Sequence, residues 1–518
     1  MSRSLTAGVA VVNPVVVGVG LHFVCGNLWW VCDDLPTMAD VEVSSEAQVT
    51  TGTGDHRLRR QLGVWDLALA QVLCVVGSTW VGVAAGLGKA QTLMWIAAMA
   101  VFYLPMAAAV IWLNRAMPLE GGLYVWAHRA FGDLVGFLTA WNLWVYGIAV
   151  TATILYATPT EIAYLIGPSA RWLPENAWAA FGIVALIVAA LTAAAIRGLE
   201  LGKWIHNVGG AAMLAVFLGL ILLPAWGLAS GRIHEGTVFA PALPEMNWRM
   251  ASMFGQMLFG ALCGLEYIAI FAGESRDPAR TIARSVWIAS PAICLMFILG
   301  TSSVAVFVPR GQLDFIAPIP QAMRAALGQT GVGNVLAMAA IVLVEIRLLG
   351  AASLLFTGIS RLPMAVGWDA LVPRWFTRLD AKRKMPVNSI LCSAALVLLM
   401  VGMASAGVHA QETNQLLSNA SLTHYELTYL VMFAAPIVGV RTLRRQMPLW
   451  LKWVCGVGFC STMFSLLISV FPFVDVVNPW VYGGKILGTV VVSNLIAVGF
   501  YFFRKRDQGA EILRQEKL

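Results

Sequence analysis

Residues 75–88 read VVGSTWVGVAAGLG, and residues 253–267 read MFGQMLFGALCGLEY. Both stretches are apolar enough for a membrane, and both are interrupted by glycines. Glycine alone is readily explained, because membrane helices use it for close packing. Two interrupted segments at corresponding positions in two halves of a chain are instead typical of transporters built from inverted repeats. The pair predicts a site formed by two broken helices.

The composition places most of the chain in lipid. Of its 518 residues, 59% are hydrophobic and 12% are charged, whereas soluble domains carry about 25% charged residues. After residue 60 we count twelve apolar spans, each near the length of about 20 residues that crosses a bilayer as a helix. They cover approximately residues 63–88, 92–113, 133–158, 176–196, 204–227, 250–272, 286–308, 332–359, 387–406, 414–439, 449–471 and 481–503. We therefore expect an all-α integral membrane protein with twelve transmembrane helices.

The two glycine-broken segments are spans 1 and 6, which suggests two repeats of five helices followed by two additional helices. We expect the first repeat at residues 61–228, the second at 229–440, the additional helices at 441–503 and a cytosolic tail at 504–518. Residues 1–60 are expected to be an N-terminal extension and cytosolic tail. Within them, an apolar run is interrupted by Asn13-Pro14 and followed by no A-x-A cleavage site. We favour translation from Met38 over a thirteenth helix or a signal peptide.

The net charge of +7 is explained by topology. With the residue-63 end in the cytosol, 25 of the 34 Lys and Arg residues fall in cytosolic segments and 7 in outer loops. This asymmetry follows the positive-inside rule and places both the residue-60 end and the C-terminus in the cytosol. We expect a multi-pass protein of the cytoplasmic (inner) cell membrane, with the lipid bilayer and no nucleic acid as a partner.

The sequence carries no motif for catalysis or for a cofactor. Its eight cysteines form no CxxC pair and no Cys/His metal spacing. Gly88-Lys89 resembles a phosphate loop, but Val83 stands where the first glycine belongs and Ala90 replaces Ser or Thr. We expect no metal, no cofactor and no enzyme activity. The alternatives from another class are a channel, for which no repeated pore motif appears, and a receptor that binds without translocating.

An unwound membrane helix offers backbone groups that suit a zwitterion. Such backbone is tolerated only where it lines a cavity or is packed in protein. The N–H groups at the start of a half-helix can hold a carboxylate, and freed carbonyls can hold an ammonium group or a cation. The chemistry of the two broken spans therefore points to amino acids.

Three further segments resemble one family. Residues 117–146, MPLEGGLYVWAHRAFGDLVGFLTAWNLWVY, look like the P-x-x-GG-x-Y-x-W…FG…GF…W signature of amino acid–polyamine–organocation (APC) permeases. Residues 273–282, GESRDPARTI, resemble its E-x-x-x-P-x-R segment, and residues 360–376, SRLPMAVGWDALVPRWF, its S-R…D-G-x-x-P-x-x-F loop, with Ala370 in place of glycine. The resemblance runs from about residue 60 to 505. It implies a LeuT-like, five-plus-five inverted-repeat fold and a secondary transporter working by alternating access, as a uniporter, symporter or exchanger.

The same resemblance implies where the substrate binds. The family's carboxylate loop falls on residues 77–79, where Thr79 replaces the usual glycine and narrows the loop. The unwound part of span 6 falls on residues 261–263. Relatives often carry an aromatic gate just before it, whereas Gly260 fills that slot here and Phe259 is the nearest ring. The substrate-binding candidates are Gly77, Ser78, Thr79, Phe259, Gly260, Ala261, Leu262 and Cys263.

Glu266 is the candidate for proton coupling. A charge at the bilayer centre costs at least ~3 kcal/mol, so such a residue faces a cavity or a partner. Glu266 follows the expected break in span 6 by about half a turn, and a carboxyl that exchanges a proton as the cavity opens to each side could couple transport to pH. The alternative is a protonated acid that only bonds neighbouring helices. Some proton-coupled relatives carry a lysine midway along span 5, but residues 211–214 read AAML, so the coupling ion, proton or sodium, stays open.

Other polar residues in the spans are secondary candidates. Glu345 and Arg347 in span 8 are two apart and cannot pair face to face, so each needs a partner on another helix. We favour a structural ion pair over contact with substrate or proton. His424 is expected near the outer end of its span, and Trp144 of span 3 is as consistent with packing as with binding. The secondary candidates are Tyr146, Asn142, Glu345 and Glu426. If Glu266, Glu345 and Glu426 bound several cationic nitrogens, the substrate would be a polyamine or another amine.

Overall fold

The computed structural model of the protein describes residues 63–117, 122–197, 199–233, 242–245, 247–266, 278–365, 374–380, 385–438 and 447–515. Residues 1–60 with the expected start at Met38 lie outside the described residues. So do residues 118–121, 273–277 and 366–373, which belong to the three segments that resemble the permease signatures.

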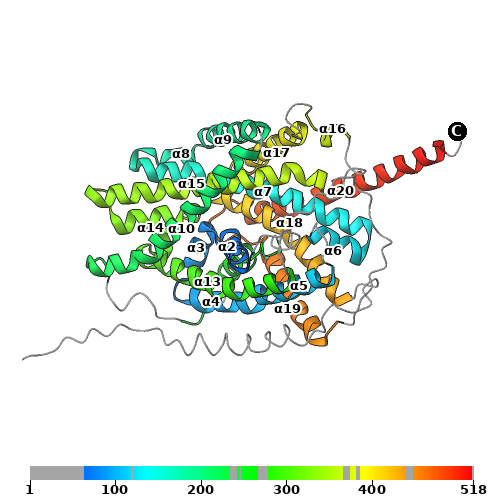
Figure 1. The fold of residues 1–518 in the computed structure, drawn as a ribbon. Helices are drawn as coiled ribbons and strands as arrows, with labels where there is room; N and C mark the ends of the chain where they lie inside the picture. Colours follow the sequence, from blue (N-terminus) through cyan, green and yellow to red (C-terminus); the bar gives the residue numbers. More distant parts are fainter. Residues whose placement is uncertain are drawn as a thin grey trace, which may run out of the picture.

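Every regular element in this part of the chain is a helix (Figure 1). Nine of these helical segments are long and apolar enough to cross a membrane. They are α4–α5 (Gln91–Ala98 and Leu104–Ala116, joined by a π-helical turn at Met99–Tyr103), α7 (Asp133–Ile166), α9 (Ala177–Arg197), α10 (Leu199–Ala229), α13 (Pro278–Phe307), α15 (Gly331–Ala365), α17 (Val387–Ser405), α19 (Leu449–Ile468) and α20 (Pro479–Gln515). Each overlaps one of the spans expected from the sequence, as a multi-pass membrane protein requires.

The other three expected spans are helical but differ from a continuous apolar helix. The first consists of two short helices, α2 (Val64–Val75) and α3 (Ser78–Ala85). The sixth begins as α11 (Trp248–Gly260), which is only 13 residues long. The tenth, α18 (Ala410–Val438), is long enough, but its first half is rich in Gln, Asn, Ser and Thr. Two of the three are therefore interrupted and one is polar.

The helices pack in layers around a central pair, α7 and α18. α7 packs against α18 and α15, α10 packs along α15, and α19 packs along α18 (Figure 1). α9 and α17 pack together at one edge of the molecule, and α4, α5 and α13 lie on the opposite side of the view. The short helices α2 and α3 lie near the centre of this view and both pack against α13. The interrupted first span is thus enclosed by other helices.

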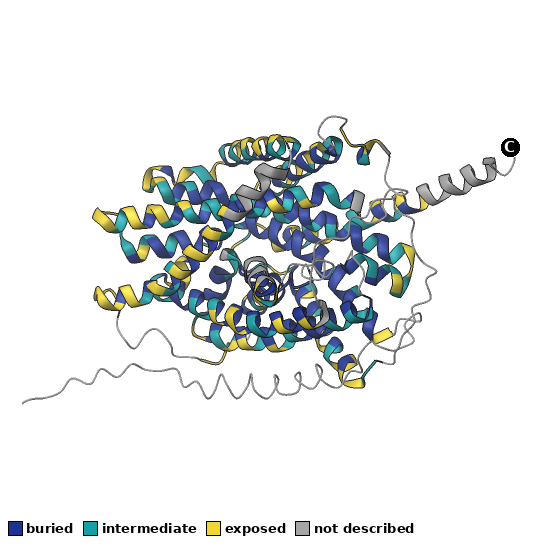
Figure 2. Cartoon of the chain, in the orientation of Figure 1, coloured by how far each residue is buried: buried dark blue, intermediate teal, exposed yellow. Residues whose placement is uncertain are grey.

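The distribution of burial is that of a protein solvated by lipid. Large apolar side chains are exposed on the outer helices, among them Trp178 and Leu186 of α9 and Trp480 and Leu495 of α20. The polar residues of α18, in contrast, are almost all buried. Figure 2 shows the same contrast, with exposed positions concentrated on the outer helices and buried ones in the middle. Apolar side chains facing outward and polar ones facing inward fit a membrane environment.

Candidate substrate site

The first broken span presents helix-start N–H groups inside the protein. Val76 and Gly77 are the non-helical residues between α2 and α3. Gly77 has an extended backbone (φ −113°, ψ 143°) and, lacking a side chain, gives α3 no side-chain cap. The first N–H groups of a helix have no partner within that helix and carry the positive end of its dipole. The first turn of α3, which begins with Ser78 and Thr79, can therefore receive a carboxylate. The side chain of Ser78 is outside the description.

The second broken span ends in a turn and then in irregular backbone. α11 stops at Gly260, and the N–H groups of Leu262 and Cys263 donate to the carbonyl of Phe259 at 3.2 and 3.0 Å. Gly264 has φ +109°, a conformation that side-chain-bearing residues rarely adopt, and this prevents the helix from continuing. Its N–H donates to the hydroxyl of Tyr429 on α18 at 2.9 Å. Residues 261–266 are thus buried, irregular backbone held by a neighbouring helix.

One aromatic side chain joins the two breaks. A Cβ atom placed on Gly77 would lie 2.9 Å from Cδ1 of Trp80, and one placed on Gly260 would lie 2.6 Å from its Cζ2. The indole of Trp80 therefore packs directly on the backbone of both glycines. At Gly260, where relatives were expected to carry an aromatic gate, the space is occupied by a ring that comes from the first broken span.

The other glycines of the first broken span have a packing role. A Cβ atom on Gly82 would lie 2.6 Å from Pro318, the first residue of α14 (Pro318–Leu327), and one on Gly86 would lie 2.9 Å from the sulfur of Met253 on α11. Both positions are helical or nearly so and buried. Glycine in this segment thus serves two purposes, interruption at Gly77 and close approach at Gly82 and Gly86.

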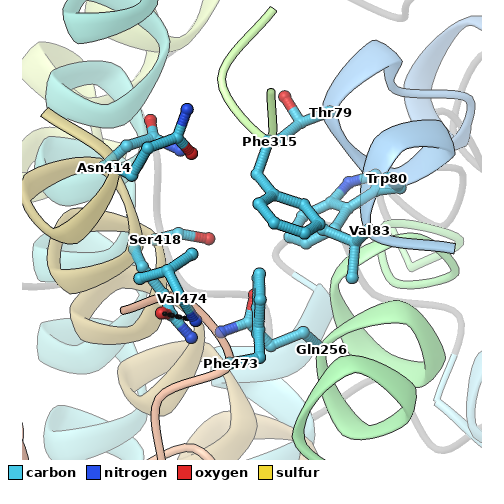
Figure 3. A pocket seen from close by; sticks show the side chains of 11 residues that line it. Thr79, Trp80, Val83, Gln256, Phe315, Asn414, Ser418, Phe473 and Val474 are labelled. Carbon is cyan, nitrogen blue, oxygen red and sulfur yellow. Dashed lines mark hydrogen bonds between the residues drawn. The ribbon is translucent and has the colours of Figure 1, made fainter. Parts of the chain in front are cut away.

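A narrow cavity adjoins Trp80. It lies between α3 and α11 on one side and α18 on the other (Figure 3). Phe315, Phe473 and Val474 line it from connecting segments. The remaining lining residues are Thr79, Trp80, Val83, Gln256, Gln411, Asn414, Gln415 and Ser418, and none of the lining side chains is charged. Thr79 and Trp80 place the first break at the edge of this cavity.

The amides on α18 were missed from the sequence. The Oε1 atom of Gln415 accepts from the N–H of Val474 at 3.3 Å, while its Nε2 atom is buried and has no hydrogen-bond partner among the described residues. Gln411 donates to Asp314 at 2.7 Å. Gln256 of α11 donates to Asn419, whose amide in turn donates to the hydroxyl of Tyr482 at 2.8 Å. The available signal was the run ETNQLLSNAS in an expected membrane span, since polar residues there face a cavity or one another.

A model of the amino acid permease family matches residues 62–497. The chain belongs to this family. The permease is thus a membrane transporter of the APC superfamily and not an enzyme. It is 23% identical to an uncharacterised transporter of Legionella pneumophila, over 87% of this chain and 98% of the relative. It is 22% identical to the probable agmatine/putrescine antiporter AguD of Lactococcus lactis (71% and 77% covered) and 23% identical to the branched-chain amino acid permease BcaP of Bacillus subtilis (65% and 73%).

In the permease, Glu266 comes at the end of the second break and is hydrogen-bonded to two side chains of α18. The hydroxyl groups of Tyr425 and Tyr429 each donate to one of its two carboxylate oxygens. Tyr146 of α7 stacks on Tyr425 with ring centroids 3.9 Å apart, and Phe259 packs edge-on against Tyr429 at 5.0 Å. Three of the predicted residues, Glu266, Phe259 and Tyr146, are thus brought together around two tyrosines. The side chain of Glu266 is buried and does not line the cavity.

Glu426 lies where α18 packs against α11 and α19. Its side chain is fully buried, and one oxygen accepts a hydrogen bond from Ser465 of α19. His424, two residues earlier, is also fully buried, and its Nδ1 atom is 2.7 Å from the carbonyl of Ala420. Neither residue lines the cavity beside Trp80.

The remaining candidates lie away from the breaks. Asn142 and Asn494 form reciprocal amide hydrogen bonds of 2.7 and 3.1 Å that link α7 to α20. Glu345 of α15 accepts from Thr158 of α7 at 2.9 Å. Glu161, on the same helix as Thr158, is buried, and its Oε2 atom has no hydrogen-bond partner among the described residues. Glu345 thus has a hydrogen-bond partner on another helix, and Glu161 is a buried acid that the sequence did not single out.

Proposed function

We propose that the permease is a secondary active transporter that moves amino acids across the cytoplasmic membrane by alternating access. In this proposal α2–α3, α11 and α18 complete a set of twelve membrane spans, with repeats at residues 61–228 and 229–440 and two additional helices at 441–503. The position of the two interruptions supports the five-plus-five arrangement. The residue-60 end and the C-terminus are assigned to the cytosol, because the Lys and Arg residues are concentrated on that side.

The observation that carries the proposal is the meeting of the two breaks at Trp80. The start of α3 supplies N–H groups at Gly77, Ser78 and Thr79 for the substrate carboxylate. The end of α11 supplies backbone carbonyls at Gly260 and at residues 261–263 (Ala261, Leu262 and Cys263) for the ammonium group. Helix starts favour negative charge and helix ends positive charge. A zwitterion with both groups on one carbon matches two opposite helix ends that share one side chain.

The lining of the cavity favours a substrate with an uncharged side chain. Its lining combines amides of α18 with aromatic rings and contains no charged side chain. A cationic or anionic side chain would lose its hydration there without gaining an opposite charge, which is costly. Amides such as those of Asn414 and Gln415 both donate and accept hydrogen bonds. We therefore assign neutral amino acids as the preferred class.

Glu266 is the proposed coupling group. It is the last described residue of the irregular backbone of the second break, and its two tyrosine partners belong to α18, which also forms the cavity wall. A movement of the second break relative to α18 would separate the carboxyl from these donors and change its affinity for a proton. Proton symport or exchange follows from this assignment, and sodium coupling is the competing arrangement.

Uptake into proteoliposomes tests the function. Purified permease would be reconstituted and offered a panel of labelled neutral, acidic and basic amino acids and amines, with and without a proton or sodium gradient. We expect concentrative uptake of neutral amino acids driven by an inward proton gradient. Binding without any uptake or exchange would identify a receptor. Uptake that depends on neither the proton nor the sodium gradient would identify a uniporter.

Transport of a polyamine or another organic amine is the second candidate. It is favoured by one relative whose name is that of a probable agmatine/putrescine antiporter. Against it, an amine without a carboxylate has no use for the N–H groups of α3, and Glu345 lies away from the breaks beside Thr158. Preferential uptake of putrescine or agmatine over neutral amino acids in the same panel would establish this candidate.

A further inference from the structure

Glu426 and Glu266 differ in the number of hydrogen-bond donors that reach their carboxyl groups. Glu426 lies midway along α18, fully buried, where α18 meets α11 and α19. The hydroxyl of Ser465 is its partner at one oxygen, and the same hydroxyl lies 2.9 Å from the carbonyl oxygen of Gly255 on α11. The other carboxyl oxygen is buried and has no hydrogen-bond partner among the described residues.

A serine hydroxyl carries one hydrogen atom and can donate to only one acceptor at a time. With Glu426 ionised, Ser465 faces two acceptors, the carboxylate and the Gly255 carbonyl, and can donate to only one of them. The Gly255 carbonyl also accepts the backbone N–H of Phe259 within α11, whereas the carboxylate has no other donor among the described residues. An ionised, buried carboxylate with a single shared donor is costly to keep in the membrane. Glu266 has no such shortage, since two tyrosine hydroxyls each donate to one of its oxygens.

We propose that Glu426 is a proton-binding site separate from Glu266, linked through Ser465 to the outer half of the second broken span. The carboxyl O–H of Glu426 donates to Oγ of Ser465, and the hydroxyl of Ser465 donates to the carbonyl of Gly255. With this one added proton, both hydrogen bonds, from Glu426 to Ser465 and from Ser465 to Gly255, have a hydrogen atom of their own. When the proton leaves, the hydroxyl of Ser465 turns to the carboxylate, and the hydrogen bond from Ser465 to the Gly255 carbonyl is lost. That carbonyl then keeps only the N–H of Phe259 from its own helix.

Few charged groups face this carboxyl. The thiol of Cys263 is within electrostatic reach of it. The charged residues on the described helices around α18 lie toward helix ends. Arg249 and Lys452 are exposed at the starts of α11 and α19, Arg115 is in the last turn of α5, and His128 and Arg129 are in the last turn of α6 (Gly122–Phe131). Asp133 and Glu161 are toward the two ends of α7, Lys485 is near the start of α20, and the other charged residues of α20 follow Phe503. On α18 itself, Glu412 is in the first turn and His424 is two residues before Glu426. The release of a proton from Glu426 is therefore not offset by a neighbouring cation.

The consequence concerns α11, because this helix ends in the second break. Protonated Glu426 ties α11 to α18 and α19 through Ser465, and deprotonation removes that tie. Proton binding at Glu426 and the position of α11 are then thermodynamically linked, whichever substrate the permease carries. Release of a single proton changes such an equilibrium by at most about tenfold per pH unit.

Infrared spectroscopy of the full-length protein in lipid tests the protonation directly. The carbonyl stretch of a protonated carboxylic acid is separate from that of a carboxylate. We expect Glu426→Gln to remove one component of this band and Ser465→Ala to shift the same component, because its hydrogen bond is lost. Glu345→Gln is the control, since that acid lies on another helix pair and its substitution should leave the component in place. An unchanged band in both Glu426→Gln and Ser465→Ala would overturn the proposal.

Hydrogen–deuterium exchange tests the link to α11 without any substrate, so its failure is distinguishable from failure of the proposed function. The exchange of residues 248–260 would be compared with that of α9 in the same molecule, which corrects for the intrinsic effect of pH. We expect this ratio to rise with pH in the wild type, by up to about tenfold per unit, and to be flat in Glu426→Gln, whose amide can donate to Ser465 at every pH. A wild-type ratio that does not change with pH would refute the link. A ratio that depends on sodium rather than pH would show that a cation, not a proton, occupies the site.

Discussion

The helix is interrupted differently in the two broken spans. In the first, helix resumes after two residues, and α3 begins at Ser78. In the second, the helix ends at Gly260 and the backbone is still irregular at Glu266, with Gly264 in a conformation that excludes helix. The first break is thus short and framed by helix on both sides, while the second is longer and depends on the tyrosines of α18. In the proposed mechanism, the short, framed break would bind the group that all substrates share, the carboxylate, and the longer break would be the part that moves.

The largest effect is expected at the first break. Gly77→Val would place its Cβ atom 2.9 Å from the indole of Trp80 and add two further methyl groups. Overpacking of this kind costs up to about 3 kcal/mol, so substrate affinity should fall about 100-fold. Binding of labelled substrate to purified protein measures this. Gly358→Val is the matched control, because no atom beyond the glycine's own stretch of helix lies within 4 Å of the added Cβ; an equal loss in both variants would contradict the special role of Gly77.

The contact between the breaks can be tested from the other side. Gly260→Ala would bring its Cβ atom to 2.6 Å from Cζ2 of Trp80. We expect affinity to fall by about 10-fold to 30-fold, equivalent to ~1.4–2 kcal/mol. In a double-mutant cycle with Trp80→Leu, the smaller side chain should recover most of that loss, because interacting residues are non-additive. Strictly additive effects would mean that the two breaks do not communicate through Trp80.

The longer break is expected to carry the pH dependence. Glu266→Gln retains the shape of the side chain but cannot titrate, so the variant should bind and exchange substrate within about tenfold of wild type (~1.4 kcal/mol). The pH dependence of transport should disappear. Tyr429→Phe removes one donor to Glu266 and should shift the pH profile without flattening it. A profile that survives intact in Glu266→Gln would make this residue structural.

The smallest effect is expected at Thr79, which lines the cavity in the first turn of α3. Thr79→Gly should widen the site and raise the relative affinity for bulkier side chains by about fivefold, equivalent to ~1 kcal/mol. Competition between labelled alanine and unlabelled larger amino acids measures this preference. An unchanged order of affinities would place the substrate side chain against another wall.

The sequence was sufficient to place the two interruptions, because glycine in an apolar span has only a few uses. At Gly77 and Gly260 the structure has a helix boundary, as the paired segments suggested. At Gly82 and Gly86 the alternative explanation applies, since these glycines let a proline and a methionine approach closely. Choosing between the two uses requires the neighbour across the gap, and sequence spacing does not supply it.

The partners of the site residues were not predictable for the same reason. The pattern singled out Gly260 as lacking an aromatic ring, but the ring beside it is that of Trp80, 180 positions earlier in the chain. Glu266 was recognised by its depth, whereas Tyr425 and Tyr429 looked like ordinary aromatic residues of a span. Glu161 escaped notice near the end of a long helix. In each case a tertiary contact, not a local propensity, determines the role.

The polarity of α18 has a consequence for how the protein is made. An isolated helix beginning AQETNQLLSNASLTHYE would enter the bilayer poorly, because each buried amide needs a partner that lipid does not provide. In the finished molecule those partners come from neighbours on both sides along the chain, including Gln256 of α11 and Tyr482 of α20. Because α20 follows α18 by some 40 residues, this helix cannot be fully accommodated until the last segments have been synthesised. In the proposed twelve-span arrangement, α18 should therefore insert fully only after α20 has been synthesised, and truncation before Pro479 should reduce its insertion into the bilayer.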